Sequence, residues 1–119
     1  MGQVIAFANN QVIVAGPGTT STILTDPVPM NDSDQLTCHL NVDYIFSVGG
    51  SGLVYTAHVS MDGSTWIPCG VTDSANAIGT KILGPTTVPA AFVRFELKYT
   101  AGAVVGAVGF DLHVMIDHA

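Results

Sequence analysis

Apolar and polar residues alternate strictly over 35–48, and this pattern constrains the fold more than any other feature of the chain. Successive side chains of a strand point to opposite faces, so a period of two predicts a long antiparallel strand with one buried face. The same period recurs over 53–61, 91–99 and 108–116. The residues expected to point inward are Leu36, Cys38, Leu40, Val42, Tyr44, Phe46, Val48, Leu53, Tyr55, Ala57, Val59, Met61, Ala91, Val93, Phe95, Leu97, Tyr99, Val108, Phe110, Leu112, Val114 and Ile116.

Turn residues divide the rest of the chain into shorter strands. A first strand pair is expected over Val4–Ala8 and Gln11–Ala15, because Asn9 and Asn10 between them tolerate the left-handed backbone of a turn. About eight strands in 119 residues predict a single all-β domain over 1–119, an antiparallel two-sheet sandwich of the jelly-roll type. Further strands are expected over 20–25, 64–69 and 77–83, with loops over 73–76 and 84–89.

A tight hairpin is expected at Asp62 and Gly63, which stand between two alternating runs. Asp-Gly is the strongest short signal of a β-hairpin, because glycine accepts the positive φ of the turn. The only tryptophan, Trp66, follows at once. An outward indole could stack on a sugar, whereas an inward one would anchor the core. The position beside a turn favours a role in the core or in an interface.

A second hairpin is expected between the runs 35–48 and 53–61. Placing Val48 opposite Leu53 puts the apolar residues of both runs on one face. The same register puts Asp43 opposite His58 on the outer face, where we expect them to form a polar pair.

The low charge content of the chain predicts self-association. Apolar residues make up 48% of the sequence and charged residues only 10%, against about 25% in ordinary soluble domains. Such neutral surfaces tend to be covered by other subunits, although a net charge of −6 could also keep a monomer in solution. Three basic residues, Lys81, Arg94 and Lys98, are too few for nucleic acid or anionic lipid. The N-terminal segment lacks the basic region of a signal peptide, and no apolar run approaches the ~20 residues of a membrane span.

No motif in the sequence predicts catalysis or a bound cofactor. The four histidines lack the short spacing of metal ligands. The single glutamate, Glu96, lies between Arg94 and Lys98, which favours an ion pair over the paired carboxylates of a glycosidase. Cys38 and Cys69 are expected to be reduced. The sequence therefore predicts no catalytic, metal-binding or cofactor-binding residues, and a protein that is not an enzyme.

The Trp66 hairpin carries a family resemblance. Ser60-x-Asp62-Gly63-x-x-Trp66, followed by the strand 91–97 with Arg94 at its centre, resembles the discoidin and galactose-binding-like jelly rolls. This resemblance implies a β-sandwich, with Asp62, Gly63, Trp66 and Arg94 as possible ligand or interface contacts. It also implies a carbohydrate-binding adhesion module as the alternative function, with a carbohydrate as the partner.

The whole chain resembles the small β-sandwich proteins of tailed bacteriophage virions, in which the same DGxxW hairpin occurs. It is short, poor in charge, and rich in Gly, Thr, Val and Ala. This resemblance implies a non-enzymatic capsid decoration or cement protein, or a head-fibre protein, located in the virion after assembly in the host cytoplasm. Its implied partners are sister copies in a homotrimer and the major capsid protein or other virion subunits. Residues 1–15 are then expected to form an intersubunit arm or strand pair.

Overall fold

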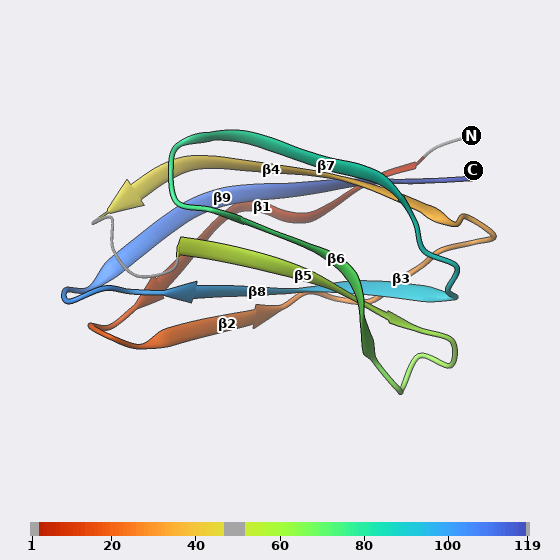
Figure 1. Cartoon of the computed structure of the whole chain (residues 1–119), viewed down its shortest axis with the longest axis horizontal. Helices are drawn as coiled ribbons and strands as arrows, with labels where there is room; N and C mark the ends of the chain where they lie inside the picture. The colour runs from red at the N-terminus through yellow and green to blue at the C-terminus, as the bar shows by residue number, and fades with distance from the viewer. Residues whose placement is uncertain (1–2, 47–51, 119) are drawn as a thin grey trace.

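The computed structural model describes residues 3–46 and 52–118 (Figure 1). This part of the chain consists of strands and their connections, so it contains no helix that could cross a membrane. The strands are β1 (Gln3–Ala15), β2 (Thr20–Leu24), β3 (Val28–Pro29), β4 (Gln35–Phe46), β5 (Gly52–Ser60), β6 (Ile67–Ala75), β7 (Gly79–Thr87), β8 (Phe92–Thr100) and β9 (Gly106–Asp117).

The strands form two antiparallel sheets that lie one above the other in Figure 1. One sheet has the order β1-β9-β4-β7, and the other has the order β2-β8-β5-β6 with the short β3 also paired to β8. Six of the eight connections pass from one sheet to the other, which is the winding of a jelly roll. The predicted fold class, an all-β antiparallel two-sheet sandwich, is confirmed.

The first and last strands of the fold are neighbours. β1 pairs with β9 along its whole length, from Gln3 opposite Ile116 to Ala15 opposite Gly106. The N-terminal end of β1 and the C-terminal end of β9 therefore lie side by side at one end of the sandwich (Figure 1).

The predicted inward faces of 53–59, 93–99 and 108–116 are confirmed, since every second residue there is buried. An aromatic cluster joins the two sheets at the centre of this core. The ring of Phe95 lies 4.8 Å from that of Phe7 in the opposite sheet and 5.9 Å from that of Tyr55 in its own sheet, both edge-on. Edge-to-face contacts of this kind add to the stability gained from burying the rings.

The inward face predicted for 35–48 is buried only as far as Val42. Leu36, Cys38, Leu40 and Val42 are buried, but the pairing with β9 shifts between Val42 and Tyr44. A β-bulge adds one residue and so reverses which side chains face the core. The structure therefore corrects the prediction for Tyr44 and Phe46, which are 51% and 48% exposed, while Val48 lies outside the described residues.

Two other predicted inward residues stand outside the strands. Met61 is 75% exposed because β5 ends at Ser60. Ala91 is half-buried and immediately precedes β8.

The predicted N-terminal strand pair is wrong, because β1 is one continuous strand along β9. Asn10 does adopt a left-handed backbone, with φ of 51°, but it does so at an irregularity in the pairing rather than in a turn. Its backbone N–H donates to Asp111 Oδ1 at 2.6 Å. Asn10 therefore adopts the left-handed backbone that the sequence predicts. A β-bulge can contain such a residue just as a hairpin turn can.

The predicted pairing of 35–48 with 53–61 is also wrong. β4 lies between β9 and β7, whereas β5 lies between β8 and β6 in the other sheet. Asp43 and His58 are therefore not a cross-strand pair. Both sheets bury one face against the same core, so the alternation identifies the buried face of a strand and does not identify its neighbour.

The boundaries of β6 and β7 also differ from the prediction. β6 begins at Ile67 and continues through the predicted loop at 73–76 as far as Ala75. β7 continues past Leu83 to Thr87 and includes Pro85. Proline has no backbone N–H to donate. Because β7 is the edge strand of its sheet, this does not remove a hydrogen bond between two central strands.

Candidate functional site

The predicted Asp62-Gly63 hairpin is present, although its turn is longer than a tight two-residue turn. The last paired residues are Val59 and Ile67, so the chain reverses through a loop over 60–66, here called the hairpin loop. Asp62 organises this loop. Its Oδ1 accepts the backbone N–H groups of Ser64 and Thr65 at 2.8 Å each and the Ser60 hydroxyl at 2.9 Å.

Hydrogen bonds within the hairpin loop hold Asp62 in its charged form. Donation from the Thr65 backbone N–H, then from that of Ser64, and then from the Ser60 hydroxyl lowers the pKa of Asp62 from 3.8 to about 2. Each of these donors stabilises the carboxylate relative to the neutral acid.

We expect acid to loosen the hairpin loop before it unfolds the sandwich. The folded-state pKa of Asp62 is below its unfolded value, so its stabilising contribution is complete above about pH 3.8 and is lost as the pH falls toward about 2. The emission of Trp66, at the end of the loop, should change over this interval. Asp62→Asn should give the acid-type emission already at neutral pH. An identical acid transition in both proteins would contradict the role given to Asp62.

Trp66 lies over the outer face of the second sheet. The guanidinium carbon of Arg94 on β8 lies 4.4 Å from the centroid of the indole ring, a cation–π contact. The indole is half-buried and is not part of the core, so the core role considered for Trp66 is wrong. Gly63, with φ of +80°, lies over the ring of Phe92, since a Cβ added there would be 3.6 Å from that ring. The hairpin loop therefore folds back over two successive outward residues of β8.

His58 lies beside this cluster. It stands opposite Arg94 across the β5–β8 pairing. Both His58 Nδ1 and Arg94 Nε are buried and have no hydrogen-bond partner in the described structure. The next outward residue of β8, Glu96, forms an ion pair with Lys98, whose Nζ lies 3.4 Å from Glu96 Oε1, which confirms the predicted ion pair. The structure thus brings Trp66, Arg94 and His58 together, with Asp62 and Gly63 in the same hairpin loop as Trp66. It leaves Asp43 in the other sheet.

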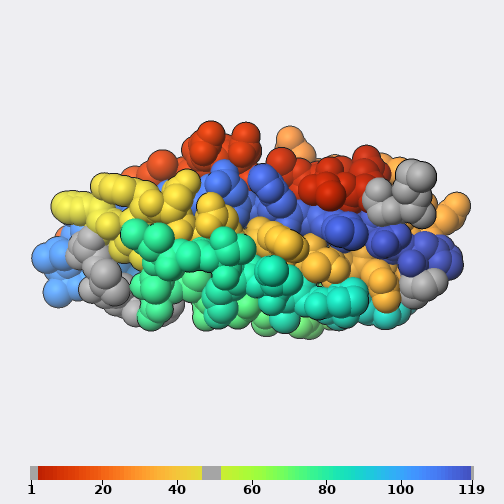
Figure 2. Space-filling view, turned by 90° about the horizontal axis from the view of Figure 1, so that it is seen from above, coloured from red at the N-terminus to blue at the C-terminus, as the bar shows by residue number. Residues whose placement is uncertain are grey.

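A second candidate is the outer face of the β1-β9-β4-β7 sheet, here called the flat face. Figure 2 looks onto it and shows the four strands as neighbouring bands. Its pairing register aligns Val14, Ala107 and Phe46 in one row and Val12, Gly109 and Tyr44 in the next. The large apolar side chains exposed on it are Val4, Val12, Val14, Tyr44, Phe46, Ile82 and Met115, each between 39% and 64% exposed.

The flat face carries few charges. His39 and His113 stand opposite each other near its centre, with Ala6 and Ile82 at the ends of the same row. The Asp111 carboxylate accepts from the backbone of Asn10. Sequence reasoning missed this face because Tyr44 and Phe46 were assigned to the core, and nothing in the alternation marks the bulge that turns them outward.

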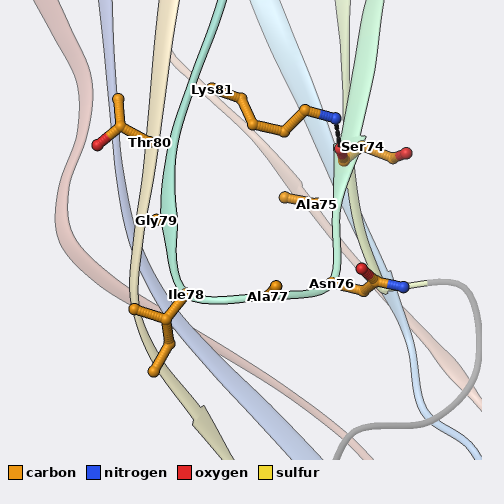
Figure 3. A pocket seen from close by; sticks show the side chains of 8 residues that line it. All are labelled: Ser74, Ala75, Asn76, Ala77, Ile78, Gly79, Thr80 and Lys81. Carbon is orange, nitrogen blue, oxygen red and sulfur yellow. Dashed lines mark hydrogen bonds between the residues drawn. The ribbon is translucent and has the colours of Figure 1, made fainter.

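Three hollows lie on the surface of the described residues. The crossover from β6 to β7 borders an open hollow of about 310 Å³ over 74–81, in which the Lys81 ammonium donates to the Ser74 carbonyl at 2.7 Å (Figure 3). Two shallow apolar hollows of about 220 and 510 Å³ share Met61, Pro89 and Ala90 beside the hairpin loop. In residues 3–46 and 52–118, no three His, Cys, Asp or Glu side chains converge as metal ligands.

Cys38 and Cys69 are free thiols in the structure. Cys38 is fully buried, and burial raises the pKa of its thiol to about 12. Because the thiolate is the reactive form, Cys38 is a poor nucleophile at neutral pH.

No protein-family model and no curated protein matches the sequence. Among solved structures, the chain is similar to a chain in the structure of infectious bursal disease virus Gt strain, with a TM-score of 0.54 and 14% identity over 99% of this chain. A chain of the Gx strain structure gives a TM-score of 0.47 and 14% identity over 98% of this chain. The protein spans 32% of the length of each viral chain. At this identity the similarity establishes a shared fold, that of a jelly-roll portion of a chain from a virus structure.

Proposed function

We propose that this protein is a non-enzymatic structural component of a virus particle, a decoration or cement protein of a tailed-phage head. The flat face carries the proposal. Large apolar side chains lie exposed on both sides of the row that contains His39 and His113. Exposed apolar patches on a soluble protein mark interaction sites. The shared fold with a chain from a virus structure and the low charge of the sequence both support the same assignment.

The flat face is suited to burial against other subunits. Its rows of valine and aromatic side chains stand on a rigid sheet, so docking costs little conformational entropy. Gly109 lets Tyr44 lie close to the sheet, because a Cβ there would be 3.0 Å from the Tyr44 Cβ. Each apolar side chain removed from water contributes about 25 cal/mol per Å² buried. Repeated over many equivalent positions, such contacts would stabilise a shell by mass action.

The edge of the same sheet offers a second contact. β1 is an edge strand, and the backbone groups on its free side can pair with another chain. We propose that residues 1–15 contact a sister copy there, in a closed homotrimer whose partners in the virion are the major capsid protein or other subunits. Closed symmetry would cover the exposed edge.

The mass of the native protein in solution tests this function. We expect a species of about three times the chain mass of 12.3 kDa by light scattering after size-exclusion chromatography. The double variant Val12→Asp/Tyr44→Asp places two charges on the flat face and should give monomers that no longer bind particles lacking this subunit. Both side chains are more than half exposed, so the fold should tolerate the changes.

Leu24→Asp is the matched control. Leu24 is 52% exposed on the outer face of the other sheet, opposite Glu96. This variant should assemble and bind like the wild type. A wild-type monomer without affinity for any shell would overturn the proposal, and so would equal loss of assembly in both variants.

A further inference from the structure

We propose that Trp66 and Arg94 form a binding site for the carboxylate of an acidic sugar. The site lies on the outer face of the β2-β8-β5-β6 sheet, away from the flat face. The proposed sugar binding can therefore be tested independently of the proposed docking function. It would give the particle surface an affinity for acidic glycans in addition to any mechanical role.

The Arg94 guanidinium lacks a carboxylate partner in the described structure. The chain has nine acidic and three basic residues, and the other two bases both form ion pairs, Lys81 with Asp73 and Lys98 with Glu96. Arg94 instead stacks on Trp66. An arginine without an acid in so acidic a chain leaves its charge available to a ligand.

The stacking also prepares the guanidinium for a carboxylate. The planar guanidinium presents parallel N–H groups that match the two oxygens of a carboxylate, and these bidentate hydrogen bonds are among the strongest in proteins. Trp66 fixes the group from one side at 4.4 Å, so less side-chain entropy is lost when the ligand binds. Buried polar atoms without partners are rare in folded proteins. In the described structure they are Arg94 Nε and His58 Nδ1, which lie at this position, and the Tyr55 hydroxyl, which lies in the core.

The surroundings favour a sugar over an acidic peptide as the carrier of the carboxylate. The indole is half-exposed, and an aromatic surface packs on the C–H groups of a sugar ring. Hydroxyl groups are present on the same elements, with Ser64 and Thr65 in the hairpin loop and the Thr56–Thr72 pair on β5 and β6. A net charge of −6 repels a polyanionic peptide, whereas a monosaccharide brings one negative charge.

The fluorescence of the native protein reports on this site directly, because Trp66 is the only tryptophan. Glucuronate and N-acetylneuraminate should change its emission saturably and should bind at least about tenfold more tightly than glucose or acetate, as expected when a charge-assisted bidentate contact is added to a ring contact. Arg94→Gln should abolish this preference. Arg94→Lys keeps the positive charge but lacks the parallel N–H groups of the guanidinium, so its affinity for the acidic sugars should fall about tenfold.

Lys98→Gln is the matched control. It makes the same change in charge on the same face of β8, and binding should remain as in the wild type. Equal affinity for acetate and the acidic sugars would overturn the role of the sugar ring. Binding of a glutamate-rich peptide in place of the sugars would assign the site to protein docking. An Arg94→Gln variant that folds and binds as the wild type does would overturn the site altogether.

Discussion

Replacing Phe95 with alanine is expected to lower the free energy of unfolding by about 3–5 kcal/mol. Phe95 is fully buried, and its ring contacts Phe7 of the opposite sheet and Tyr55 of its own sheet. The surrounding strands are held by their ladders and can collapse only partly into the space. The loss therefore combines the transfer of the ring from water with the cost of the cavity. Urea unfolding followed by Trp66 emission measures the change.

Phe92→Ala on the same strand is the control for the Phe95 variant. Phe92 points to the outer face and is half-buried under Gly63 of the hairpin loop. Its loss should cost about 1 kcal/mol, because water and the loop can fill the space. Equal destabilisation by the two changes would show that the aromatic contact between the sheets is not the centre of the core.

Gly84→Ala is expected to destabilise the protein by about 2–5 kcal/mol. Gly84 has φ of +117°, a conformation that residues with a Cβ rarely adopt. An added Cβ would also lie 2.5 Å from the Leu36 carbonyl oxygen and 3.1 Å from the Thr37 Cα, both backbone atoms of β4. Neither atom can move without breaking the β4–β7 ladder. Thermal unfolding by circular dichroism should show a large fall in Tm.

Gly18→Ala separates the two contributions. Gly18 also has a positive φ, of 65°, but a Cβ there would meet nothing within 4 Å. This variant should lose only the cost of the left-handed backbone, about 1 kcal/mol. If the two alanine variants lost the same stability, the close approach of β7 to β4 would not matter for Gly84.

The sequence alternation predicted which faces are buried much better than it predicted which strands are neighbours. The inward residues of β5, β8 and β9 follow from a period of two, because one side of each strand lies against the core. Two features escaped this reasoning. The bulge after Val42 reverses the faces without any change in residue type, and the placement of β4 and β5 in different sheets depends on contacts made far along the chain.

The hairpin loop was more predictable than the flat face. Asp62 and Gly63 predict a turn from their own chemistry, because the carboxylate accepts nearby backbone N–H groups and glycine adopts a positive φ. The contact of Trp66 with Arg94 needs the neighbouring β8, and the resemblance of 60–66 and 91–97 to a known hairpin and strand brought these residues together as candidates. The flat face arises only when four strands align, so no single segment of sequence predicts it.

The pairing of Gln3 with Ile116 has a consequence for protein engineering. Because the first and last strands end side by side, a fluorophore or peptide fused at either end would project from the same pole of the sandwich (Figure 1). The β8–β9 connection, with Val104 and Val105 exposed, lies at the opposite pole. A circular permutant that joins the present ends and opens this connection would carry its fusion on the other pole, and the two versions would display cargo in opposite directions from one fold.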